Sequence, residues 1–188
     1  MTAGPRARLI ESAIELVREQ GVHAAGLAAL LDRSNASRNS LYQHFPAGKS
    51  ELVETATKIA GDRMTSVIDK VTAAGPPEQW LAALVGWWKQ TLEQSAFTAG
   101  CPIVGAALAE SEPRVQAAAG AALGDWADHL ATAFTGSGIP PARAASLASF
   151  VVSAIEGAIV QSRARKSTTP LDEAQEHLVA LLSATTPA

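Results

Sequence analysis

The chain has 188 residues, a net charge of −3 and 47% hydrophobic residues, so it is long enough for one large or two small domains with a buried core. Its single cysteine, Cys101, excludes an internal disulfide and favours a reducing compartment. The N-terminus lacks the apolar core of a signal peptide, and Arg143 and Glu156 interrupt the apolar segment that follows Ile139. We therefore expect a cytoplasmic protein that does not span a membrane.

The net charge hides an asymmetry along the chain. Residues 1 to 50 contain six Lys or Arg and four acidic residues, whereas residues 51 to 188 contain nine and fourteen. An excess of two positive charges is small, but Arg6, Arg8, Arg38 and Lys49 fall at or near predicted helix starts. The basic part of the chain is therefore a candidate for contact with a polyanion.

Three helices are predicted within the first 50 residues. The first covers about residues 6–20 and ends at Gly21, and the second covers about 27–33. A tight turn at residues 34–36 follows, in which Asn35 suits a left-handed backbone, and Ser37 caps a third helix at 37–45. In that helix Leu41 and Phe45 face inward, and the other side chains from Arg38 to His44 form a polar outer face.

Six further helices are predicted after the break at residues 46–48. They cover about residues 49–72, 78–94, a short stretch from Pro102 to near Glu110, 113–135, 142–165 and 171–184. Because period-2 alternation is absent and alanine is abundant, we expect an all-α fold of about nine helices.

The predicted helix at 142–165 is apolar on two sides. Leu147, Val151, Ile155 and Ala158 form one stripe, and a second stripe contains small residues that permit close approach of another backbone. The second stripe and the last helix predict a homodimer interface, unless the helix is buried within one subunit. The predicted interface residues are Phe150, Ala154, Gly157, Gln161, Leu178 and Leu181.

Two short helices joined by a three-residue turn match a helix-turn-helix, whose second helix enters the DNA major groove. The segments GVHAAGL, NSLYQHFP and GKSEL, which flank and include the third helix, resemble the DNA-binding domain of the tetracycline-repressor (TetR) family of bacterial regulators. The later GCPIVGAAL is similar to the LmrA-like (YxaF-like) branch. The resemblance implies a helix-turn-helix DNA-binding domain at residues 1–50 and a helical ligand-binding and dimerisation domain at 51–188.

By this resemblance the third helix reads double-stranded operator DNA. Arg38 suits a bidentate contact with guanine, and Asn39 one with adenine. Ser37, Ser40, Tyr42 and His44 suit phosphate contacts. Lys49 would bind a phosphate together with free amides of its helix, and Arg6 and Arg8 would grip the DNA backbone. The alternatives are packing of Tyr42 and His44 against the first helix, and solvated surface charges for the basic residues.

The resemblance also implies a small-molecule effector in the larger domain. Aromatic walls with a few polar groups are typical of such sites, and the candidates are Trp80, Trp87, Trp88, Cys101, Trp126, His129 and Phe150. Core packing is the alternative for each tryptophan and for Cys101, and His129 is a pocket group or a surface residue.

These observations favour a ligand-responsive transcriptional regulator, with repression and activation both open. An enzyme would need catalytic residues that the sequence does not suggest. The four histidines have no metal-ligand spacing, and neither a phosphate-binding loop nor a cofactor motif occurs. A helical interaction protein without DNA binding would leave the polar third helix unexplained.

Overall fold

The computed structural model describes residues 4–184, and within that range it contains nine α-helices and no strand. The helices are α1 (Pro5–Ala24), α2 (Leu27–Ser34), α3 (Arg38–His44), α4 (Lys49–Thr72), α5 (Pro77–Gln94), α6 (Pro102–Ala107), α7 (Pro113–Gly136), α8 (Pro141–Arg165) and α9 (Thr169–Ser183). The predicted all-α fold is confirmed.

Local signals account for most helix bounds. Six helices, α1, α5, α6, α7, α8 and α9, have a proline in their first turn, where the missing amide hydrogen would have no helical partner. The first helix differs from the prediction, because it does not end at Gly21. Gly21 has a φ of 77° and kinks the chain, and the helix resumes and continues to Ala24.

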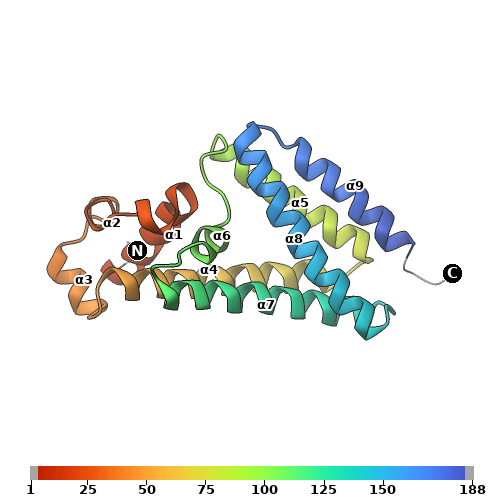
Figure 1. Cartoon of the computed structure of the whole chain (residues 1–188), viewed down its shortest axis with the longest axis horizontal. Helices are drawn as coiled ribbons and strands as arrows, with labels where there is room; N and C mark the ends of the chain where they lie inside the picture. Colours follow the sequence, from red (N-terminus) through yellow and green to blue (C-terminus); the bar gives the residue numbers. More distant parts are fainter. Residues whose placement is uncertain (1–3, 185–188) are drawn as a thin grey trace. The chain divides into compact units, whose positions relative to one another are not determined.

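The chain forms two compact units, each built from two separate segments. Unit 1 consists of residues 1–62 and 101–122, and unit 2 of residues 63–100 and 123–188. Helices α4 and α7 contribute to both units. The colours of Figure 1 show that α6, from the middle of the sequence, folds beside α1.

Unit 1 has α1 at its centre, in contact with α2, α3 and α6. Its core contains Leu9, Val17, Leu30, Leu41 and Phe45, all nearly inaccessible to solvent. Helix α6 approaches the α1 kink so closely that a Cβ atom on Gly105 would lie 3.0 Å from the Val17 carbonyl oxygen. Glycine at 105 is therefore what permits this contact.

The start of α7 packs along the first half of α4 within unit 1. The Glu54 carboxylate is largely buried and pairs with Lys58 at 2.7 Å and Arg114 at 2.9 Å. The Lys58 hydrogen bond, assisted by the charge of Arg114, lowers the pKa of the Glu54 carboxyl despite its burial. The hydroxyl of Ser50 donates to Glu112 at 2.6 Å. Segment 101–122 is thus attached to the N-terminal helices by polar as well as apolar contacts.

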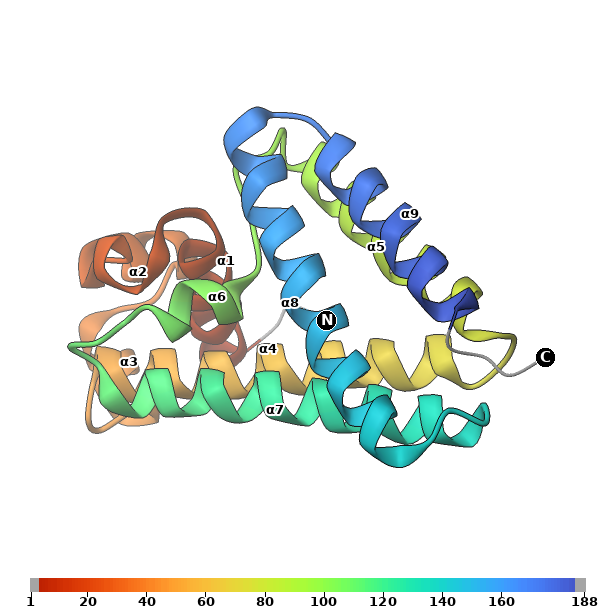
Figure 2. The ribbon, with the colours of Figure 1, turned by 45° about the vertical axis from the view of Figure 1, so that its right-hand side comes forward.

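In unit 2, α9 packs against both α5 and α8, and Figure 2 shows α9 running beside α5. Leu171, Leu178 and Leu182 of α9 are buried. At the rim, Lys89 of α5 pairs with Asp172 of α9 at 2.6 Å. These contacts make α5, α8 and α9 one packed layer.

Helix α8 has the two apolar sides expected from its sequence. Leu147, Val151, Ile155 and Ala158 are buried inside unit 2, which confirms the inner stripe. On the other side the Phe150 and Val160 side chains are 55% and 50% exposed. By length and composition alone α8 could cross a membrane, but a core helix passes the same test, so this one helix is weak evidence for a span.

Candidate functional site

Helix α3 is held by contacts at its N-terminal end. Asn35 adopts the predicted left-handed conformation with a φ of 46°, and the Ser37 hydroxyl accepts a hydrogen bond from the Ser40 amide at 3.1 Å. The Arg8 guanidinium of α1 donates from Nε to the Ser34 carbonyl at 2.9 Å. The turn before α3 is therefore fixed both by its own residues and by α1.

The two sides of α3 differ sharply in polarity. Leu41 within the helix and Phe45 after it are buried in unit 1, as predicted. Ser37, Arg38, Asn39, Tyr42, Gln43 and His44 are exposed, and Ser40 is half-buried. The outer face therefore presents a guanidinium, an amide, a phenol and an imidazole, which together donate and accept hydrogen bonds.

Several predicted DNA-binding residues also have partners inside unit 1. The Arg6 guanidinium lies over the Phe45 ring, 5.6 Å from its centroid. The Lys49 ammonium donates to the Val22 carbonyl at 3.0 Å. The Tyr42 ring covers the turn after α3, where a Cβ atom on Gly48 would lie 3.2 Å from Tyr42 Cε1. Arg38 and His44, in contrast, are exposed on the outer face.

A bidentate ion pair joins α1 to α2. The Arg33 Nη1 and Nη2 atoms each donate to a Glu19 carboxylate oxygen at 2.8 Å. These hydrogen bonds, with the positive charge of Arg33, lower the pKa of the Glu19 carboxyl, and the same pair raises the pKa of Arg33. The ion pair fixes the helix that precedes the turn into α3.

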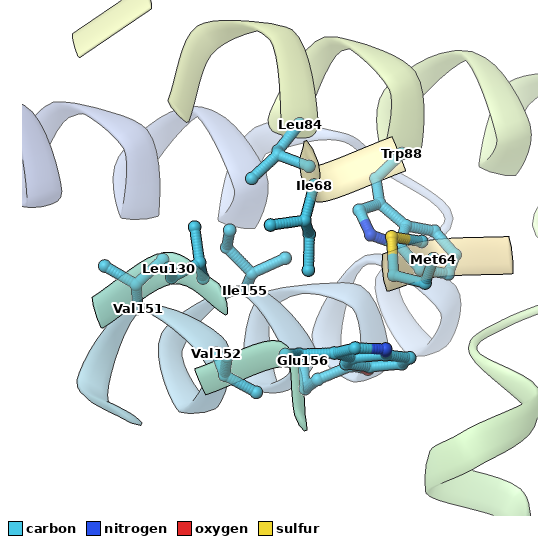
Figure 3. A pocket seen from close by; sticks show the side chains of 10 residues that line it. Met64, Ile68, Leu84, Trp88, Leu130, Val151, Val152, Ile155 and Glu156 are labelled. Atoms are coloured by element: carbon cyan, nitrogen blue, oxygen red, sulfur yellow. The ribbon is translucent and has the colours of Figure 1, made fainter. Parts of the chain in front are cut away.

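Unit 2 contains an apolar pocket between α4, α5, α7 and α8. The cavity has a volume of about 30 Å³, room for one or two water molecules. In Figure 3, Ile68 and Ile155 point toward each other across the pocket and Glu156 extends from α8 along one side. The lining residues are Met64, Ile68, Leu84, Trp88, Trp126, Leu130, Val151, Val152, Ile155 and Glu156.

Of the residues proposed from the sequence as effector contacts, Trp88 and Trp126 line this pocket. Trp80 is buried elsewhere in unit 2, where its indole Nε1 donates to the Ala74 carbonyl at 3.0 Å and its ring packs on Phe134. Trp87 is 39% exposed and stacks edge-on against Trp88, with 4.7 Å between the ring centroids. Trp87 therefore packs against Trp88, which lines the pocket, and does not line the pocket itself.

The other three candidates lie apart from the pocket lining. Cys101 is buried in unit 1, and Phe150 is exposed on the outer side of α8. His129 lines a separate open hollow of unit 2, where its Nδ1 lies 2.6 Å from an Asp69 carboxylate oxygen. No cluster of three or more metal-ligating side chains occurs among residues 4–184.

Sequence reasoning missed most of the pocket wall. Met64, Ile68 and Leu84 carry no signal that separates a pocket residue from a core residue. Glu156 does carry such a signal in the sequence, because it is the single charged residue of α8 between Arg143 and Arg163. A lone acid in the middle of an apolar helix is the pattern by which this residue is recognisable.

The predicted interface residues gather on the exposed side of α8 and α9. Ala154, Gly157 and Gln161 line a shallow hollow together with Glu173 and His177 of α9. Phe150 is exposed nearby on α8, and Leu181 is half-buried. Leu178 is a correction, because its side chain is 2% exposed and packs within its own unit. Leu178 therefore packs beneath the exposed side of α8 and α9 and is not part of that surface.

Two family models match separate parts of the chain. Residues 9–56 match the N-terminal domain of the tetR family of bacterial regulatory proteins. Residues 77–177 match the C-terminal domain of LmrA/YxaF-like transcriptional regulators. The first match contains α2, α3 and the turn between them, and the second contains α5 through most of α9.

Relatives match over nearly the whole chain. An uncharacterized HTH-type transcriptional regulator of Mycobacterium tuberculosis is 38% identical over 98% of this chain and 97% of its own length. The HTH-type transcriptional regulator LmrA of Bacillus subtilis is 29% identical, with 88% and 90% covered.

Solved structures share the fold. The regulatory protein TetR from Rhodobacter sphaeroides has a TM-score of 0.81 at 19% identity, covering 93% of this chain and 96% of its own. A TetR-family regulator from Streptomyces coelicolor has a TM-score of 0.82 at 18% identity, with 97% and 96% covered. The polar helix of a helix-turn-helix, the two family matches and these relatives agree, and the chain belongs to the TetR family of transcriptional regulators, in its LmrA/YxaF-like branch.

Proposed function

We propose that this DNA-binding regulator is a repressor that binds a palindromic operator as a homodimer and leaves it when a small-molecule effector binds in unit 2. The observation that carries the proposal is the exposed polar face of α3, held in place by the Ser37 cap and the left-handed turn at Asn35. A helix so presented suits the major groove. Such a regulator acts where the chromosome is, in the cytoplasm.

The residues of α3 have distinct proposed roles. Arg38 would bridge guanine O6 and N7, and Asn39 would pair with adenine. Tyr42, His44 and Ser40 would contact phosphates at the groove edge, where short or ring-borne donors suffice. Ser37 would do so while its oxygen remains the cap acceptor of α3.

Basic residues outside α3 would hold the DNA backbone. Lys49 lies in the first turn of α4, where its ammonium and free helix amides suit a phosphate, although it also donates to Val22. Arg6 and Arg8 would approach the backbone from the start of α1. Their contacts with Phe45 and the turn mean that they also organise the site that they serve.

The proposed dimer forms through the exposed side of α8 and α9. Phe150 and Val160 supply apolar area, and the small residues Ala154 and Gly157 permit close approach. Gln161 and Leu181 would lie at the same surface. Such a homodimer would carry two α3 helices, one for each half of a palindrome.

The proposed effector site is the apolar pocket. Helix α4 carries Lys49 in its first turn and Met64 and Ile68 in the pocket wall. A shift of this helix on effector binding would therefore alter the DNA-binding end, and strong release requires a preference of several kcal/mol for the non-binding conformer. In functional terms we propose a DNA-binding domain at residues 1–50 and an effector and dimerisation domain at 51–188.

The test is DNA binding measured by fluorescence anisotropy, with duplexes covering the region that flanks the chain's own gene. We expect salt-dependent binding to a palindromic segment. Arg38→Ala should weaken it by roughly 1–3 kcal/mol, about 5- to 150-fold, for each half-site of the palindrome, because each protomer loses its base contact. Arg165→Ala removes the same charge from an exposed position at the end of α8 and should leave affinity within about twofold. Equal affinity of wild type and Arg38→Ala would contradict the assignment.

A further inference from the structure

The apolar pocket of unit 2 holds one ionisable side chain. Nine of its ten lining residues are apolar or aromatic, and the tenth is Glu156. One of its carboxylate oxygens, Oε2, is buried. The lining contains no Lys, Arg or His among its described residues. The wall of this pocket is therefore anionic when Glu156 is ionised.

The position of Glu156 is costly for a residue that only fills space. It lies in the middle of α8, directly after Ile155 and one turn from Val152 and Ile159, and an ionised carboxylate among apolar groups loses solvation free energy. A leucine or methionine would fill the same volume without that cost. An acid at this position instead supplies the pocket wall with a negative charge that can attract a positive ligand.

The aromatic members of the wall add to that attraction. The electron-rich faces of Trp88 and Trp126 attract cations, most strongly where water is excluded. The Met64 thioether is polarisable and adapts to different shapes. We infer that the effector is an organic cation with an apolar body, a quaternary or protonated amine, whose charge lies beside Glu156. This inference rests on the proposed function in taking the pocket as the effector site.

The small volume of the cavity means that side chains must move before such a ligand can enter. At about 30 Å³ it is far smaller than the several hundred Å³ of an occupied drug-sized site. A cation with an aromatic or branched body therefore enters only when wall side chains move. Met64, with three rotatable bonds, is the wall residue that moves at least cost, and it belongs to α4.

The test uses two probes of the same shape and different charge. Benzyltrimethylammonium is permanently positive, and 2,2-dimethylpropylbenzene is its uncharged carbon isostere. Binding of each is measured by calorimetry and by the shift in unfolding temperature, with wild type, Glu156→Gln and Glu93→Gln. Glu93 is an exposed acid of unit 2 outside the pocket lining, so its variant controls for the lost charge.

The cation should bind wild type and Glu93→Gln at least about tenfold more tightly than the isostere, and Glu156→Gln should lose that preference while its affinity for the isostere stays within about threefold. Equal or tighter binding of the isostere by wild type would overturn the cation assignment and leave the pocket as a site for neutral ligands. Failure of both probes would overturn it as well. The operator assay needs no ligand, so neither result bears on DNA binding.

Discussion

Gly48 lies at the point where the backbone leaves the polar helix α3 and turns toward α4. Its φ is 74°, a region in which side chains with a Cβ atom are strained, and Tyr42 packs over it. The same residue therefore permits the turn and leaves room for an aromatic ring of the proposed DNA-binding face. The backbone conformation of this one residue therefore helps to position Tyr42 on that face.

Gly48→Ala is expected to destabilise the protein by roughly 1–2 kcal/mol, because alanine is strained at positive φ. Gly48→Asn should cost less, since asparagine tolerates this region better. The measurement is the urea unfolding midpoint. As a control, Gly86→Ala lies inside α5 with open space around the new Cβ atom and should stabilise by about 1 kcal/mol. Similar losses at both sites would show that the turn is not constrained.

The Glu19–Arg33 ion pair predicts a pH dependence of stability. Because the pKa of Glu19 is lowered in the folded chain, its contribution is present above the unfolded pKa, about 4.3, and is lost as pH falls through the folded value. Glu19→Gln should therefore cost about 0.5–1 kcal/mol at pH 7 and almost nothing at pH 2. Urea unfolding at both pH values measures this difference.

Glu110→Gln, at an exposed position of the same unit, is the control for the Glu19 comparison. It should change stability little at either pH, because no ion pair of Glu110 occurs in the described part of the chain. A Glu19→Gln penalty that persists unchanged at pH 2 would mean that packing, not charge, accounts for it.

At the scale of elements, the helix bounds were predictable because their causes are local. Prolines lie in the first turn of six helices, and Asn35 and Ser37 form the turn and the cap that their side chains favour. The pocket wall was not predictable, because Trp80 and Trp88 look alike in the sequence. Only three-dimensional packing decides that one ring meets Phe134 and the other faces a cavity.

The contact of α6 with α1 depends on one small residue. Gly105→Ala would place a Cβ atom 3.0 Å from the Val17 carbonyl oxygen, so α6 must shift, at an expected cost of about 1–3 kcal/mol. Gly120→Ala is the matched control, since it lies in α7 of the same unit and its new Cβ atom meets nothing within 4 Å. Thermal unfolding of both variants measures the difference, and equal midpoints would show that α6 repacks freely.

At the scale of the whole molecule, the exposed side of α8 predicts self-association. Phe150→Asp should weaken the proposed dimer by roughly 2 kcal/mol or more, because a charge replaces a large apolar group at its centre. Sedimentation equilibrium measures the dissociation constant. Leu108→Asp changes an apolar side chain that is 74% exposed in unit 1 and should leave the dimer intact. A Phe150→Asp protein with wild-type association would place the interface elsewhere.

The two-segment build of unit 1 has a consequence for engineering and for evolution. The N-terminal helices share a core and the Glu54–Arg114 ion pair with residues 101–122. A chimera that joins residues 1–62 of this regulator to the remainder of a relative would therefore pack α1 against a mismatched α6. An exchange of operator specificity between such proteins therefore requires that residues 1–62 and 101–122 are transferred together. Recombination at a single crossover point should yield poorly folded hybrids, whereas grafting only the exposed side chains of α3 should not.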